Sequence, residues 1–171
     1  MNKQLVVLQR GYVLVGVPDH REYFQLDNVS VVRRWGTDQG VGQLVNGPTR
    51  NTVLDPIPGT VEIGDTALLM SFNVANFPSN EDPGPPVDSK TRLYVLDRGW
   101  ILVGRVYDAN AEAVTLSKAV CLRRWGTSRG LGELTNGPTP QSTIDPLPAD
   151  VRIPRHGIIF AFPVTGWDAH V

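Results

Sequence analysis

Two copies of the segment Arg-Arg-Trp-Gly-Thr contain the side chains of this sequence that could bind a charged ligand. An arginine can clamp a phosphate, a tryptophan can stack on a base, and the backbone N–H groups of a glycine-containing turn can bind an anion. The sequence therefore predicts a site for a small phosphorylated ligand, such as a nucleotide. The candidate ligand-binding residues are Arg33, Arg34, Trp35 and Thr37 in the first copy and Arg123, Arg124, Trp125 and Thr127 in the second.

A structural role is the alternative interpretation of the same residues. A Pro-flanked aspartate follows each copy, Asp55 in the first and Asp145 in the second. Each aspartate could form an ion pair inside its own copy, Arg34 with Asp55 and Arg124 with Asp145. The segment also lacks the Gly-Lys-Ser/Thr of a phosphate-binding loop. Both interpretations stay open at this point.

The residues that most often carry catalysis or bind metals do not recur. His20, His156 and His170 have no histidine at the matching position of the other copy. Cys121 matches Val31 of the first copy. A histidine-based metal site or a histidine-activated nucleophile would therefore exist in one copy at most. A paired-carboxylate hydrolase has too few matched acids. We expect no catalytic residue, no metal site and no cofactor; a hydrolase that uses His20 or His156 in one copy alone is a third alternative.

Almost the whole sequence repeats. The motif that begins at Arg33 returns ninety positions later, at Arg123, and both copies continue with Gly-x-Gly-x-Leu and Asn-Gly-Pro-Thr. Arg10 matches Arg98 at an offset of eighty-eight, so the second copy gains two residues in its first hairpin loop. We predict a tandem duplication. Its parts are a first repeat unit at 1–75, a Pro-rich linker at 76–90, and a second repeat unit with a C-terminal tail at 91–171.

Segments rich in β-forming residues, separated by glycine and proline, predict strands throughout each unit. The expected elements of the first copy are a strand over 5–16 bent near Gly11, a second strand over 23–35, a short helical turn capped by Thr37, and a closing hairpin of 60–63 with 66–74. Units of this kind form small β-barrels or β-sandwiches. The predicted fold class is all-β, with two tandem homologous units related by pseudo-two-fold symmetry.

Strand alternation assigns side chains to faces. Trp35 continues the face of Val29 and Val31, so we expect it to point into a core. Arg33 and Arg34 leave the strand on opposite sides and need a bulge to serve one pocket. The other residues expected in the core are Leu44, Leu134, Tyr12 and Trp100.

Composition limits the partners and the compartment. The formal net charge is −1, which argues against a broad basic surface for nucleic acid. The apolar run near the N-terminus is too short for a signal peptide, and no stretch is long enough to cross a bilayer. The single cysteine, Cys121, excludes an intramolecular disulfide and fits a reducing compartment. We expect a cytoplasmic protein without a membrane or nucleic-acid partner.

The order of the motifs resembles a family of small uncharacterised proteins from bacteria and their phages. The matching pattern is Arg-Gly-Tyr/Trp…Val-Gly, Arg-Arg-Trp-Gly-Thr, Gly-Val/Leu-Gly-Gln/Glu-Leu, Gly-Pro-Thr and Thr…Asp-Pro, and it covers most of both repeats. Members of that family carry one copy, whereas this chain carries two. The resemblance implies a phage-linked setting, with a virion-associated location as the alternative to the cytoplasm. It implies no activity and no catalytic residue.

Taken together, the sequence favours a non-enzymatic protein that works by self-association or by binding a partner. The residues kept in both copies shape the backbone or pack, and a duplicated chain supplies two sets of contact surfaces. We expect a homo-oligomer in the form of a ring, lattice or filament. The alternative is a nucleotide-binding protein of the anti-defence, sponge-like kind that uses the Arg-Arg-Trp-Gly-Thr turns.

Overall fold

The computed structural model describes residues 2–19, 23–85 and 88–171. Strands make up 48% of the described residues and helical turns 13%. Twelve strands join in one large antiparallel sheet, so the expectation of an all-β protein is confirmed. Within the described ranges, no helix is long and apolar enough to span a membrane.

The first half of the chain contributes six strands. Apolar and β-branched residues fill them, and glycine and proline residues separate them, as extended backbone favours. The strands pair in the order β6-β1-β2-β3, and β3 then pairs with both β4 and β5. Their bounds are β1 (Lys3–Leu8), β2 (Val13–Asp19), β3 (Gln25–Arg34), β4 (Val53–Ile57), β5 (Val61–Ile63) and β6 (Leu68–Val74).

The second half contributes the other six strands in a corresponding order. They pair as β12-β7-β8-β9, and β9 then pairs with both β10 and β11. Their bounds are β7 (Thr91–Leu96), β8 (Ile101–Ala109), β9 (Ala113–Arg124), β10 (Thr143–Pro146), β11 (Val151–Pro154) and β12 (Ile158–Pro163).

The strand registers of the two halves match at the offset of the sequence repeat. In the first half, Val31 lies opposite Asp55 and Leu26 lies opposite Val61. Ninety positions later, the partners are Cys121 with Asp145 and Leu116 with Val151. Residues at matching positions therefore occupy matching places in their strands.

Two predicted connections are wrong. The segment expected as one bent strand is a hairpin, in which the short 3₁₀ helix η1 (Gln9–Gly11) joins β1 to β2. The closing strands β5 and β6 exist, but among the described strands β5 pairs with β3 and β12, and β6 pairs with β1. Neighbouring segments need not pair with each other when a distant strand offers a better edge.

The short helical turn after each Arg-Arg-Trp-Gly-Thr segment is present. It is the 3₁₀ helix η2 (Val41–Asn46) in the first half and η4 (Leu131–Asn136) in the second. Thr37 does not cap it, because the N-cap residue is Gly40 and no side chain bonds there. Gln43 instead accepts hydrogen bonds from two backbone N–H groups of the preceding turn, at 2.8 and 3.1 Å.

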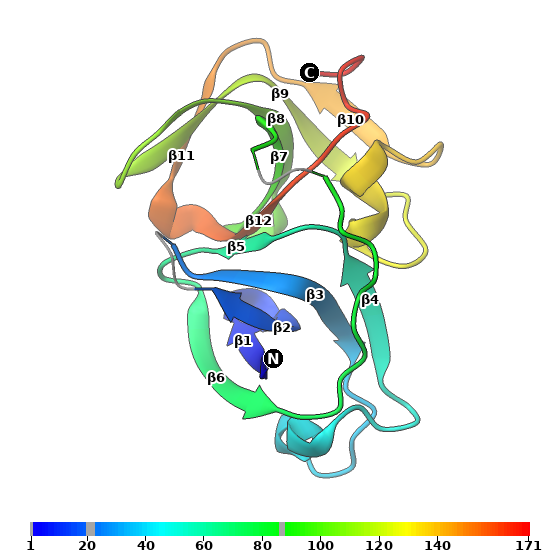
Figure 1. The fold of residues 1–171 in the computed structure, drawn as a ribbon. Coiled ribbons are helices and arrows are strands. Elements are labelled where there is room, and N and C mark those ends of the chain that lie inside the picture. Colours follow the sequence, from blue (N-terminus) through cyan, green and yellow to red (C-terminus); the bar gives the residue numbers. More distant parts are fainter. Residues whose placement is uncertain (1, 20–22, 86–87) are drawn as a thin grey trace.

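The two halves meet along one strand pair and share one core. Figure 1 shows β5 of the first half beside β12 of the second, and Ile63 lies opposite Phe160 in this antiparallel pair. The largest apolar cluster draws on both halves, from Leu26 and Ile63 to Phe160 and Trp167. We define the junction as η1, β4 and β5 on one side with η3 (Asp97–Gly99), η4 and β12 on the other.

The strand pairing at the junction has no reciprocal counterpart. By the ninety-residue offset, β11 matches β5 and β6 matches β12, so a two-fold relation would also pair β6 with β11. Within the described residues, β6 pairs with β1 alone and β11 with β9 alone. The strand pairing between the halves therefore does not follow the pseudo-two-fold arrangement expected from the sequence, whereas the matching turns η1 and η3 do contact each other.

Residues 76–85 of the segment expected as a linker are bound to the first half, whereas Ser89 and Lys90 bond to the second half. Phe77 is 8% exposed and belongs to an apolar cluster of that half. The Asn80 side-chain amide donates to the Ile57 carbonyl at 3.1 Å, and the Asn80 backbone N–H donates to Asn28 Oδ1 at 2.9 Å. These contacts fold the segment onto β3 and β4.

Candidate functional site

A bulge near the end of β3 determines which of the two predicted arginines reaches Asp55. The register of β3 against β4 shifts between Val32 and Arg34, and such a bulge ends the two-residue alternation of side chains. Arg33 reaches Asp55, with Nε 2.8 Å from Oδ2 and Nη2 3.1 Å from Oδ1. The ion pair of the first copy is therefore Arg33 with Asp55, and the predicted pairing of Arg34 is wrong.

The second copy makes the same ion pair in a different environment. Arg123, rather than the predicted Arg124, donates to Asp145 from Nε at 2.9 Å and from Nη2 at 3.1 Å. The hydrogen bond from Arg123 lowers the pKa of the Asp145 carboxyl. The Asp145 side chain is 46% exposed, whereas that of Asp55 is 5% exposed, because Asp55 lies in the junction.

The tryptophans of the motif differ in burial. Trp35 follows the bulge and is 40% exposed, so the prediction that it points into a core is wrong. Trp125 is half-buried against the largest apolar cluster and lines a junction cavity of about 230 Å³ together with Tyr12. Trp100, also expected in the core, is 61% exposed. The two leucines predicted in the core are fully buried, Leu44 and Leu134.

Close backbone contacts make the Arg-Arg-Trp-Gly-Thr turn a structural corner. Gly36 has a φ of +63°, and a Cβ atom there would lie 2.3 Å from the Asn51 carbonyl carbon. The Thr49 hydroxyl donates to the Gly36 carbonyl at 2.6 Å, and the Thr52 hydroxyl donates to the Trp35 carbonyl at 2.7 Å. The second copy makes the corresponding bonds. The glycine is thus required by this backbone approach.

Five of the predicted ligand-binding residues are exposed: Arg33, Arg34, Trp35, Arg123 and Arg124. Of the arginines, Arg33 and Arg123 are engaged by Asp55 and Asp145. Arg124 and Thr127 line an open hollow of about 590 Å³, which Glu133 also lines. The backbone N–H of Arg129 bonds the Glu133 carboxylate and lowers the pKa of that group. A negative charge therefore stays in the hollow at neutral pH and weakens its attraction for a phosphate.

The residues considered for catalysis do not gather. Among the described residues, no three His, Cys, Asp or Glu side chains lie where they could hold a metal ion. His156 is exposed, and burial raises the pKa of the half-buried Cys121 thiol. His20 lies outside the described residues. The hydrolase alternative gains no support from these positions.

Three charged side chains tie β5 to the second half. Glu62 accepts hydrogen bonds from Arg155 Nη1 at 2.7 Å and from Arg92 Nη1 at 3.2 Å. Arg155 also donates to the Asn110 carbonyl at 2.9 Å, and its guanidinium lies 4.6 Å from the centre of the Tyr23 ring. Charge-assisted bonds of this kind offset the cost of removing the three charges from water.

An open cleft of about 620 Å³ has this charged cluster in its wall. Tyr94 lies in the same wall, and burial raises the pKa of its hydroxyl to about 12, so the group is neutral at physiological pH. Both Arg92 and Arg155 already donate to Glu62. Both guanidinium groups are therefore already engaged in the contact between the halves.

The backbone of η4 packs directly on β4. A Cβ atom on Gly132 would lie 2.0 Å from the Pro56 carbonyl oxygen, and one on Gly130 would lie 3.0 Å from Asp55 Oδ2. A residue with a side chain cannot approach the facing backbone this closely. Gly132 is therefore needed for the junction, and Gly130 is also required to be glycine by its φ of +83°.

The third contact of the junction lies between η1 and η3. Arg10 Nε donates to Asp97 Oδ1 at 2.6 Å, and this bond lowers the pKa of the Asp97 carboxyl. Tyr12 contacts Phe160 edge to face, with ring centroids 5.1 Å apart. The junction thus combines strand pairing, aromatic packing, close backbone approach and ion pairs, as stable protein interfaces do.

Comparison with family models, with curated proteins and with solved structures gave no match to this chain. The junction must therefore be interpreted from its own chemistry. Sequence reasoning missed its charged residues because it compared what the copies share, and these positions differ. Glu62 aligns with Arg152, and Arg155 aligns with Asp65. The reversal of charge at matched positions is the signal that could have found them.

Proposed function

We propose that this is a non-enzymatic, self-associating protein built from two homologous β units. The observation that carries the proposal is the one-sided junction, in which β5 pairs with β12 while the outer edges of β6 and β11 stay unpaired among the described strands. β6 leaves Leu68, Leu69 and Met70 exposed by 38%, 63% and 49%. An unpaired, apolar edge strand is a template for a strand of another molecule.

Tandem duplication accounts for the two sets of edges. The sequence repeat and the matching strand registers support it. In this proposal each unit is a small β-barrel or β-sandwich with two contact surfaces. The head consists of Tyr12, β4 and β5 in the first unit and of Trp100, β10 and β11 in the second. The tail consists of Trp35, η2, Asp65 and β6 in the first unit and of Trp125, η4, Arg155 and β12 in the second. The matching turns η1 and η3 contact each other and belong to neither surface.

The two units are then related head to tail rather than by a two-fold axis. The head of the first unit holds the tail of the second, so each chain has one head and one tail unoccupied. A contact between unlike surfaces produces a ring when the rotation between units closes, and a filament or lattice when it does not. The protein acts as an assembling structural subunit in this proposal, in a phage-linked setting if the family resemblance holds.

The native mass of the purified protein tests the proposal. One chain has a mass of 18.7 kDa, and we expect light scattering to give a larger mass that depends on protein concentration. A chain that stays strictly monomeric at high concentration, and that retains no partner from a host lysate, contradicts the proposal.

Nucleotide binding is the second candidate function, and the exposed position of Arg124 beside Thr127 is the observation that favours it. Denaturing the purified protein should then release a nucleotide that mass spectrometry detects. Arg124→Ala should abolish nucleotide binding and leave the melting temperature unchanged, because the side chain is exposed. Arg123→Ala is the matched control, since Arg123 is engaged by Asp145 and should not affect binding.

A further inference from the structure

We infer that chains join by docking the free tail of one chain's first unit onto the free head of another chain's second unit, so that first and second units alternate along the assembly. The inference rests on the self-association proposed above and adds the two surfaces and their order. The occupied junction within the chain is the template, because each free surface has a counterpart there at the repeat offset.

The glycine at position 42 of η2 is explained by such docking. Gly132 of η4 must be glycine because the β4 backbone crosses it at the junction, whereas Gly130, which precedes η4, has a φ of +83°. The matching residues Gly40 and Gly42 have no atom within 4 Å of a Cβ position, and Gly42 does not adopt left-handed backbone. Nothing in the chain itself therefore requires glycine at 42. A second copy would supply the missing contact, the Pro146 carbonyl of its β10.

Exposed apolar side chains mark the same surfaces. Seven large apolar side chains are exposed among the described residues, and five of them match junction residues. The five are Trp35, Leu68, Leu69 and Met70 on the free tail and Trp100 on the free head. At the occupied junction the matching residues of β12, 158–160, are at most 1% exposed. The free surfaces thus have the apolar content of an interface that lacks its partner.

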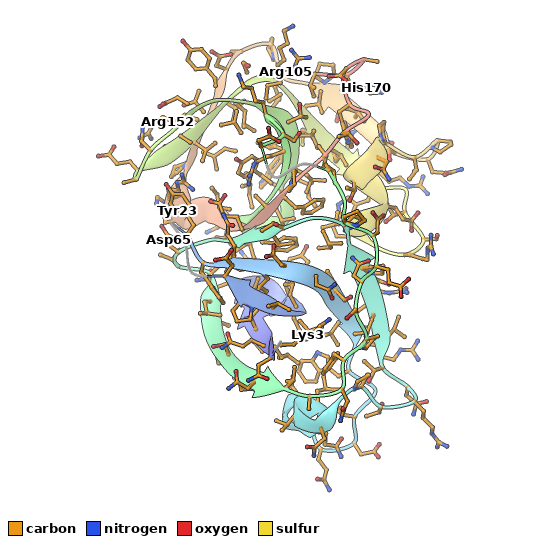
Figure 2. All side chains as sticks on the ribbon, viewed as in Figure 1. Lys3, Tyr23, Asp65, Arg105, Arg152 and His170 are labelled. Atoms are coloured by element: carbon orange, nitrogen blue, oxygen red, sulfur yellow. The ribbon has the colours of Figure 1, made fainter. Side chains whose placement is uncertain are left out.

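Charges on the two free surfaces are complementary and reversed relative to the junction. At the junction, the head residue Glu62 pairs with the tail residue Arg155. On the free surfaces the head residue is Arg152 and the tail residue is Asp65, and Figure 2 shows both on the same side of the molecule. Two first units would place Asp65 against Glu62, and two second units would place Arg155 against Arg152. Because like charges disfavour both combinations, the units alternate.

Pro154 makes the contact between chains weaker than the junction within a chain. Its counterpart, Gly64, donates its N–H to the Ile159 carbonyl at 2.9 Å and lies too close to the Ile158 carbonyl for a Cβ atom. Proline has no N–H to donate, and its ring keeps that end of a strand pair open. The contact between chains therefore depends more on η2 against β10 and on the ion pair, and it is reversible.

Sedimentation velocity of the full chain over a range of concentrations tests this docking. Asp65→Arg and Arg152→Glu should each weaken association about tenfold, as loss of a close interfacial charge pair does. The double variant should restore association, because it re-forms the pair with the charges exchanged. Pro154→Gly should strengthen association, since it returns the missing N–H.

Gly42→Ala separates docking from folding. The added methyl group meets no atom of its own chain, so the melting temperature should not fall, but it should meet the second copy and weaken association about tenfold or more. Gly157→Ala is the control, because Gly157 also has open space around it and lies outside η2; it should associate like the wild type. If Gly42→Ala, Asp65→Arg and Arg152→Glu all associate like the wild type, the proposed docking order is wrong, but self-association itself still stands. A monomeric wild-type chain overturns self-association as well.

Discussion

Glu62 and Arg155 form an ion pair of 2.7 Å although 93 positions separate them in the sequence. Both side chains are largely buried, and the pair connects β5 to the turn that precedes β12. Removing one partner leaves a buried charge without compensation, which costs about 3–5 kcal/mol. Glu62→Gln should therefore lower the free energy of unfolding by about that amount, as measured by chemical denaturation.

The matched control for Glu62 is Glu112→Gln. Glu112 pairs with Arg152 at 3.5 Å, and its side chain is 85% exposed. Exposed pairs contribute about 0–1 kcal/mol, so this variant should unfold nearly like the wild type. Equal losses in the two variants would mean that the buried cluster does not hold the halves together.

Gly132→Ala should lower the melting temperature, whereas Gly42→Ala should not. The methyl group at 132 would meet the Pro56 carbonyl oxygen at 2.0 Å, while the space around residue 42 is open. Overpacking of this kind costs about 1–3 kcal/mol or more. Thermal unfolding at low protein concentration measures the difference, and identical melting temperatures would show that β4 can move away from η4 without cost.

Arg33→Ala should destabilise the protein more than Arg123→Ala does. Each change removes a two-bond partner from an aspartate, Asp55 or Asp145. The buried Asp55 carboxylate cannot regain its lost bonds from water, and leaving such a group unsatisfied costs about 1–3 kcal/mol. Water reaches the exposed Asp145, so its loss is smaller. Urea denaturation of the two variants gives the order, and the reverse order would contradict the assignment of Asp55 to the junction.

Stability should fall at acidic pH in part because of three carboxyl groups. Hydrogen bonds from Arg10, Arg123 and the Arg129 backbone lower the pKa of Asp97, Asp145 and Glu133 in the folded state, from ordinary values of 3.8, 3.8 and 4.5. A lowered folded-state pKa contributes stability above the ordinary value, and that contribution is lost as the pH falls through the folded value. Unfolding measured between pH 7 and pH 2 should therefore show this loss below about pH 4. Asp97→Asn should make the fall less steep, and an unchanged slope would contradict a role for the Arg10 bond.

The parts of the fold with local signals could be predicted from the sequence. Leu44 and Leu134 lie in repeated turns between strands, and both are fully buried as expected. The pairing of β5 could not be predicted in the same way, because its partner residue for Ile63 is Phe160, far along the chain. The two closing segments of the first copy look like a hairpin when they are considered alone. The second half provides a competing edge strand, β12, and β5 pairs with it instead of with β6.

The candidate site shows the same limit at the level of single residues. Trp35 and Trp125 have identical local sequences, yet the first is 40% exposed and the second is packed against the shared core. Likewise, the alternation of side chains along β3 ends at a bulge between Val32 and Arg34. The position of this bulge depends on the register of β4, so alternation alone does not show which arginine reaches Asp55. Local patterns give the residue types of the site, and the contact between the halves gives their environments.

The pairing of β5 with β12 also sets an order of events during translation. Residues 63 and 160 are partners, and at ribosomal speed about 5–20 seconds separate their synthesis. Throughout that interval the β5 edge and the apolar side chains of Leu26, Val61 and Ile63 lack the cover that Phe160 later provides. A chaperone can shield this face, or the second half of a neighbouring nascent chain on the same messenger can reach it first. Exchanged second halves would then yield a domain-swapped oligomer with an unaltered junction.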